Sequence, residues 1–132
     1  THANPIQKAK AGSIGIPLPD TDAKIVDLST REDLPPGRTG EIVIRGPQVM
    51  KGYWKKPEET SEAIKENWLH TGDVAYMDDE GYFFIVDRLK DVINTAGYKV
   101  WPREVEDAIY AHPAVKMVAV VGAEDSYRGE VV

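Results

Sequence analysis

The sequence contains no cysteine among its 132 residues, which excludes structural disulfides and thiol catalysis. Its histidines, His2, His70 and His112, lack the partner spacing of a zinc site. No apolar run approaches the length of a membrane span, and no signal peptide is visible. Lys and Arg (16) are fewer than Asp and Glu (22). The net charge of −6 argues against a dedicated nucleic-acid-binding protein, although a local cationic pocket for a nucleotide phosphate stays open.

The composition of the whole chain, with 42% hydrophobic and 29% charged residues, is ordinary for a soluble globular protein. Its length suits one modest domain or pieces of two. The first residue is Thr1 rather than Met, and the final stretch, "EVV", resembles the beginning of a strand. We therefore expect an internal fragment of a longer protein.

The first two thirds of the chain are rich in strand patterns. "AKIVDLS" (23–29) and "GEIVIRG" (40–46) alternate, and the second places Ile42 and Ile44 on one face and Glu41 on the other. Pro57 fits the first turn of a helix over "KPEETSEAIKEN", for which Asn67 is the expected stop. The turn residues 78–81, "DDEG", predict a hairpin within residues 68–88.

The pattern changes after Arg88. "DVINTAGYKV" (91–100) predicts a second hairpin with Gly97 near its turn, and "PREVEDAIYAHP" (102–113) predicts an amphipathic helix. "KMVAVVGA" (116–123) is typical of a buried strand. The order hairpin, helix, strand predicts an α+β fold class, in which an antiparallel β-barrel-like part is followed by the start of a smaller α+β part. We place the boundary near 87–90.

The first hairpin also brings charged residues together. With its centre near residue 80, Asp73 lies across from residues 86–88, so that Asp73 and Arg88 emerge at the same end. One interpretation is an exposed cross-strand salt bridge, worth about 0–1 kcal/mol. The other is a ligand clamp, in which the carboxylate accepts both hydroxyl hydrogens of a ribose and the guanidinium holds a ribose or phosphate oxygen. The pattern leaves both open.

Three stretches in this order, "GEIVIRGPQVMKGYW", "WLHTGDVAYMDDEGYFFIVDRLKD" and "GYKVWPREVEDAIYAHPAVKMVAVVG", resemble the adenylate-forming superfamily of acyl-CoA synthetases, luciferases and peptide-synthetase adenylation domains. The resemblance is greatest to long- or medium-chain fatty-acid CoA ligases. It implies an enzyme that converts a carboxylate and ATP to an acyl-adenylate and pyrophosphate, and then forms a thioester with coenzyme A. The implied cofactors are ATP/AMP, coenzyme A and Mg²⁺, with the magnesium site mostly outside this chain.

The resemblance assigns a role to each candidate site residue. Asp73 of "TGD" matches the aspartate that binds the ribose hydroxyls, Arg88 matches the arginine that assists it, and Ile85 matches an apolar residue near the nucleotide. Lys90 matches the hinge between a large and a small mobile domain, although it could also be an ordinary surface charge. No metal ligand and no catalytic residue other than this hinge is expected in the fragment.

Two further positions match the second catalytic state of the family. Gly97 matches a glycine that lines the pantetheine tunnel, and Lys99 lies where a basic residue can reach a phosphate or coenzyme A, the alternative being a solvated hairpin lysine. The resemblance places residues 1–87 at the end of the AMP-binding large domain and residues 88–132 at the beginning of the C-terminal lid domain.

Several parts of the family's active site have no match here. The resemblance places the phosphate loop and the Thr-Glu motif before this chain and the catalytic lysine of adenylation after it; Lys116 does not fit that role. We expect the fragment to be inactive alone and, through its cut surfaces, able to self-associate. Expected partners are a fatty acid, ATP and coenzyme A, with no nucleic acid and no transmembrane segment. A cytoplasmic location is expected, with peripheral membrane contact as a variant. Alternatives are an aryl-CoA ligase, an acyl-AMP ligase that loads a carrier protein, or a non-catalytic nucleotide-binding module.

Overall fold

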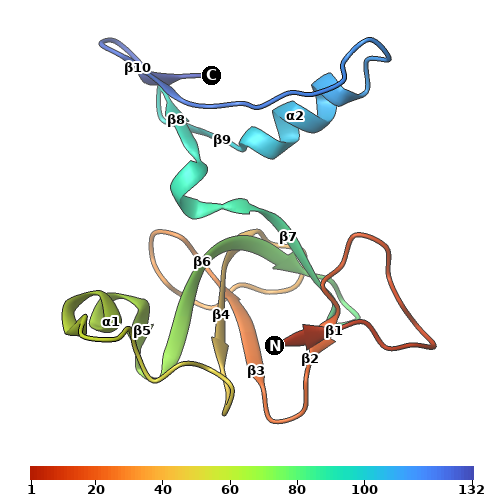
Figure 1. Ribbon diagram of the computed structural model, residues 1–132, viewed down its shortest axis with the longest axis vertical. Coiled ribbons are helices and arrows are strands. Elements are labelled where there is room, and N and C mark those ends of the chain that lie inside the picture. The colour runs from red at the N-terminus through yellow and green to blue at the C-terminus, as the bar shows by residue number, and fades with distance from the viewer. The chain divides into compact units, whose positions relative to one another are not determined.

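The computed structural model describes residues 1–132 as two compact units, Thr1–Ile85 and Val86–Val132. The first unit is built on an antiparallel sheet that curls into a half-barrel, and the second is a small α+β unit (Figure 1). The predicted α+β class with a barrel-like antiparallel sheet is therefore confirmed. No helix of the structure is long and apolar enough to cross a lipid bilayer.

The half-barrel contains β3 (Asp22–Val26), β4 (Gly40–Arg45), β5 (Ile64–Lys65), β6 (Trp68–Met77) and β7 (Phe83–Arg88). The strand order is β3-β4-β6-β5, and β7 also pairs with β6. Branched side chains face each other across the first pair, where Ile25 lies opposite Ile42. Such pairs stabilise a sheet because their side chains pack closely on its pleated surface.

The buried core of the first unit lies on one face of this sheet. Its members come from strands β3, β4, β6 and β7: Ile25, Ile42, Ile44, Ala75 and Phe83. The strand predicted over 40–46 is confirmed, and so is the hairpin, whereas the strand predicted over 23–29 ends early, at Val26. At its turn the Asp78 N–H donates to the Tyr82 carbonyl, and the Gly81 N–H donates to the Asp78 carbonyl.

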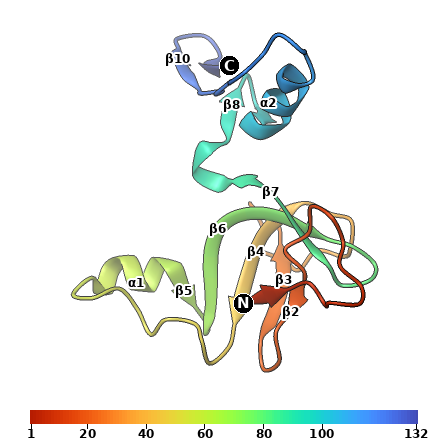
Figure 2. The ribbon, with the colours of Figure 1, turned by 45° about the vertical axis from the view of Figure 1, so that its right-hand side comes forward.

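The first predicted helix is shorter than expected. α1 (Pro57–Ala63) begins at proline, as predicted, but Ile64 and Lys65 form β5 and pair with Leu69 and Trp68. Figure 2 shows α1 leading into β5 beside β6. Glu66 and Asn67 both have positive φ, 50° and 66°, which is the backbone of a tight two-residue hairpin turn. Asn67 thus belongs to a hairpin turn, and the prediction that it stops the helix is wrong.

The amino-terminal strands bring a histidine onto the core. β1 (His2–Ala3) pairs with β2 (Ile16–Pro17), and the His2 ring meets the Phe83 ring edge-on at 4.8 Å between centroids. The His2 Nε2 is buried and has no hydrogen-bond partner. Burial, with a smaller contribution from the amino-terminal charge, lowers the pKa of His2 from 6.5 to about 4.

We therefore expect the His2 imidazole to titrate near pH 4 in the folded chain and near 6.5 in urea. The cause is that the folded state disfavours the charged ring. A histidine whose folded pKa is depressed contributes stability that is complete above pH 6.5 and is lost as the pH falls from 6.5 towards 4. Proton NMR of the imidazole checks this, with the urea-unfolded chain as the matched control. A folded-state midpoint near 6.5 would contradict the burial argument.

The second unit begins with the end of β7 and a short 3-10 helix, η1 (Leu89–Asp91). Then follow β8 (Ile93–Thr95), β9 (Tyr98–Val100), α2 (Pro102–Tyr110), β10 (Ala123–Asp125) and β11 (Gly129–Val131). The sheet order is β10-β11-β8-β9. The hairpin, the helix and the strand expected at the final "EVV" agree with the predictions. The turn of β8 and β9 holds Ala96 and Gly97, both with positive φ.

The predicted buried strand over residues 116–123 is wrong. Only Ala123 enters a strand, and residues 116–122 form no sheet pair. Instead this segment runs along α2, where the Val118 N–H donates to the Tyr110 hydroxyl and the Val120 N–H donates to the Glu106 carboxylate at 2.8 Å. Met117 and Val121 are largely exposed. Side chains of the helix therefore satisfy amide groups that the apolar sequence pattern assigned to a sheet.

Candidate functional site

The Thr71-Gly72-Asp73 segment forms a bulge of β6 in which three residues lie opposite one. Val43 pairs with His70, and Glu41 pairs with Val74. Between these two pairs β4 contributes one residue, Ile42, and β6 contributes three. Because β6 has two residues more than a regular ladder would hold here, the three residues cannot all pair with β4. Bulges of this kind redirect side chains next to functional sites. The "TGD" motif is therefore the sequence of the bulge itself.

Gly72 makes the bulge possible. Its φ is +72°, in the left-handed region that residues with a Cβ adopt only at a cost, whereas a Cβ added there would meet no atom within 4 Å. Backbone conformation, rather than crowding, therefore calls for glycine at this position.

Hydrogen bonds fix the bulge to β4. The Thr71 hydroxyl donates to the Ile42 carbonyl at 2.7 Å and accepts the Asp73 N–H at 3.1 Å. The Gly72 N–H donates to Glu41 Oε1 at 3.0 Å. The Thr71 hydroxyl and the N–H groups of Gly72 and Asp73 thus each have a specific partner, and the main chain beside Asp73 is held at two points.

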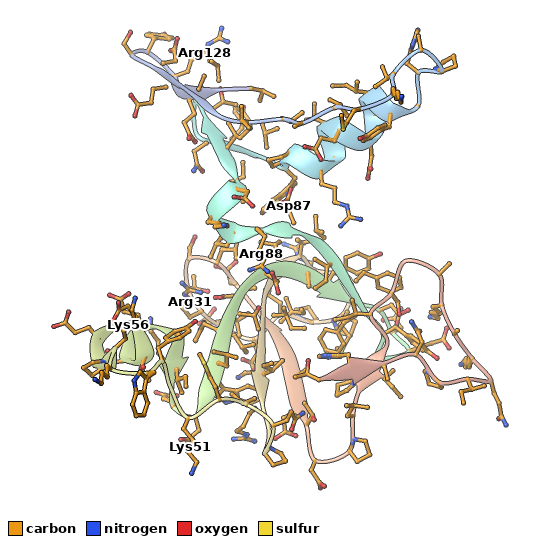
Figure 3. All side chains as sticks on the ribbon, viewed as in Figure 1. Arg31, Lys51, Lys56, Asp87, Arg88 and Arg128 are labelled. Carbon is orange, nitrogen blue, oxygen red and sulfur yellow. The ribbon has the colours of Figure 1, made fainter.

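Glu41 is the buried centre of an ionic cluster that the sequence analysis missed. Its side chain is only 3% exposed, and Oε2 contacts Arg31 Nη1 and, at 2.9 Å, His70 Nδ1 (Figure 3 labels Arg31). Burial alone would raise the pKa of Glu41. The hydrogen bonds from His70 and Gly72 and the positive charge of Arg31 more than offset burial, and the pKa lies below its ordinary value.

The signal for this cluster was present but ambiguous. Glu41 falls on the face opposite Ile42 and Ile44, as the alternation predicts, yet that face is buried here as well, with Val43 only 1% exposed. An acidic residue between buried strand positions needs partners. They come from a loop and from a neighbouring strand, and periodicity along one strand cannot identify them.

The other predicted nucleotide residues occupy defined places. Asp73 lies in β6 and Arg88 ends β7, the two strands of the first hairpin. Ile85, also in β7, is partly buried and packs against the core cluster of the first unit. Their roles towards a nucleotide remain predictions.

The hinge and second-state candidates all lie in the second unit. Lys90 is in η1 and lines an open cavity of about 720 Å³ together with Arg103, Glu106 and Val121. Gly97 has a φ of +86° in the β8–β9 turn, and no atom lies within 4 Å of the place of a Cβ. Lys99 is exposed on β9, opposite Asn94. The hairpin thus brings Gly97 and Lys99 together, while Lys90 lies in a separate segment.

No group of three or more His, Cys, Asp or Glu side chains is arranged to hold a metal ion.

Comparisons with known proteins identify relatives of this chain. The family model described as "AMP-binding enzyme" matches residues 1–54. A long-chain-fatty-acid–CoA ligase of Bacillus subtilis is 56% identical over 133 residues, covering all of this chain and 24% of the relative. A feruloyl-CoA synthase of an Amycolatopsis species is 49% identical over 122 residues, covering 92% of this chain and 25% of the relative.

A solved structure is similar throughout. ATP-bound MatB from Rhodopseudomonas palustris superimposes with a TM-score of 0.85 at 39% identity, covering 90% of this chain and 24% of MatB. The chain thus spans about a quarter of the length of the proteins it matches. This chain belongs to the AMP-binding family of adenylate-forming enzymes.

Proposed function

We propose that the whole protein is an ATP-dependent fatty acyl-CoA ligase and that this segment supplies its ribose-binding aspartate and its domain hinge. The observation that carries the proposal is the bulge at Thr71-Gly72-Asp73, found in a chain that is 56% identical to a long-chain-fatty-acid–CoA ligase. The reaction joins a fatty acid to the AMP moiety of ATP with release of pyrophosphate, and then transfers the acyl group to the thiol of coenzyme A with release of AMP.

Within this reaction Asp73 binds the nucleotide. An ionised carboxylate has two acceptor oxygens and can accept one hydrogen from each of two neighbouring ribose hydroxyls. Arg88 supplies planar donors for a ribose or phosphate oxygen, and Ile85 packs on the core beside the nucleotide. The bulge supports this role because it holds the backbone of Asp73 in place before the ligand arrives, which lowers the ordering cost of binding.

The second unit serves the thioester step. Coenzyme A provides the thiol that attacks the acyl-adenylate, and Gly97 and Lys99 would contact its pantetheine arm or a phosphate. The exposed Lys99 ammonium and the open space beside Gly97 are compatible with such a ligand. Lys90, in the single helical turn between two extended residues, would be the point about which the lid turns.

The second candidate is an aryl-CoA ligase, favoured by the 49% identity to a feruloyl-CoA synthase. Pyrophosphate exchange by the full-length enzyme with a panel of fatty and aromatic acids distinguishes the two. We expect the highest kcat/KM with long- or medium-chain fatty acids. Highest kcat/KM with an aromatic acid would establish the second candidate, and no exchange with any acid would favour a non-catalytic module. The 132-residue segment alone is the control and is expected to give no exchange.

A further inference from the structure

Resting on the proposed ribose-binding role of Asp73, we propose that Glu41 is a positioning residue for the nucleotide site. Its carboxylate holds the Gly72 backbone and, through it, the direction in which Asp73 meets the ribose hydroxyls. Glu41 touches no nucleotide in this proposal. It acts from the adjacent strand, through the bulge that separates the Val43–His70 and Glu41–Val74 pairs.

The contacts make Glu41 the main anchor of the bulge. Oε1 accepts the Gly72 N–H at 3.0 Å, one residue before Asp73, while Oε2 contacts His70 Nδ1 at 2.9 Å, one residue before Thr71. One carboxylate therefore bonds to β6 on both sides of Thr71, at the His70 side chain and at the Gly72 main chain. Arg31 contacts the same Oε2 and also restrains the Glu41 side chain.

A second anchor lies next to the first on β4. The Thr71 hydroxyl donates to the carbonyl of Ile42 and accepts the Asp73 N–H. With Glu41 in place, the amides of Gly72 and Asp73 are both bound, and the φ and ψ angles that aim the Asp73 side chain are restricted. Without Glu41, the Gly72 N–H loses its partner, and a glycine next to a functional residue gains freedom.

The burial of Glu41 argues for a specific task. A carboxylate that is 3% exposed costs free energy to desolvate, and an apolar residue at a buried ionic position is often equally stable. Charge-assisted hydrogen bonds are roughly twice as strong as neutral ones and hold geometry more tightly. The anchor is therefore suited to precise placement more than to stability.

The test is the preference of the full-length enzyme for ATP over 2′,3′-dideoxy-ATP, measured by calorimetric titration. The ratio of the two affinities isolates the ribose hydroxyls, and a purely structural defect would lower both affinities equally. We expect Glu41→Ala to lower the ratio about tenfold while the affinity for dideoxy-ATP stays near that of the wild type. Glu41→Gln, which keeps an acceptor for Gly72, should lower it about threefold and serves if the alanine variant does not fold.

Two controls separate the possible failures. Asp33→Ala removes an exposed ion pair with Lys24 near the same sheet and should leave the ratio unchanged. Asp73→Ala should abolish the preference, and adding Glu41→Gln to it should change nothing further. If Asp73→Ala leaves the preference intact, the ribose-binding role and this inference both fall. If Asp73→Ala abolishes it but both Glu41 variants preserve it, Glu41 is not a positioning residue.

Discussion

Replacement of Asp73 by alanine in the full-length enzyme is expected to weaken ATP and AMP binding by about 100-fold. The ribose hydroxyls would lose their two hydrogen bonds to the carboxylate, and each hydrogen bond to a charged group contributes roughly 1.5–3 kcal/mol. The lower end of that range gives about 3 kcal/mol for the pair, and each 1.4 kcal/mol corresponds to a tenfold change in affinity. Calorimetric titration with each nucleotide measures the effect.

The matched control for this variant is Asp79→Ala. Asp79 lies in the turn of the same hairpin, is exposed and has no ion pair, so its loss removes the same charge and should leave nucleotide affinity unchanged. Asp73→Asn retains one acceptor oxygen and should fall between the wild type and the alanine variant. Equal affinity in Asp73→Ala and in the wild type would eliminate the clamp and leave the salt-bridge interpretation of Asp73.

Local turn chemistry explains what could be predicted from the sequence. The "DDEG" turn set the centre of the first hairpin, and Gly97 marked the second; both hairpins formed where expected. Pro57 and Pro102 each begin a helix, as proline at the first helical position suggests. These features depend on a few neighbouring residues, and the short chain segments around them carry the information.

Features that depend on distant residues could not be predicted. The bulge requires a positive φ at Gly72 and an acceptor from Glu41, which is 31 positions away in the sequence. Residues 116–122 failed for the same reason, because an apolar pattern does not reveal whether a neighbouring strand is available. The amides of Val118 and Val120 bind side chains of α2 instead. In both cases tertiary partners determined the outcome.

The bulge and its anchor also bear on how the family motif works. A ribose-binding carboxylate that stood in a regular ladder would point to one of the two sheet faces, both of which contain buried residues in this unit. Three residues opposite one take Asp73 out of that alternation. In the proposed function the motif is therefore a structural device as well as a chemical one, in which threonine and glycine shape the backbone and aspartate binds the ribose.

Replacement of Lys90 by proline is expected to impair thioester formation much more than adenylation, and this is the sharpest test of the proposed hinge. Lys90 lies in η1, a single helical turn between Arg88 and Val92, both of which are extended. Proline fixes φ near −65°, a value typical of a 3-10 turn, and disfavours a helical conformation at the preceding Leu89. A lid that must turn about residue 90 would then be held in one state.

We expect the proline variant to retain pyrophosphate exchange within about tenfold of the wild type. The rate of thioester formation from added acyl-adenylate should fall on the order of 100-fold, because closure steps of this kind limit the reaction that follows them. Lys90→Ala removes the same charge but leaves φ free, and should be near normal in both half-reactions. Equal losses in the two half-reactions of Lys90→Pro would point to general damage of the enzyme. A loss in Lys90→Ala as large as that in Lys90→Pro would instead indicate that the ammonium group, and not rotation about residue 90, is what the second half-reaction requires.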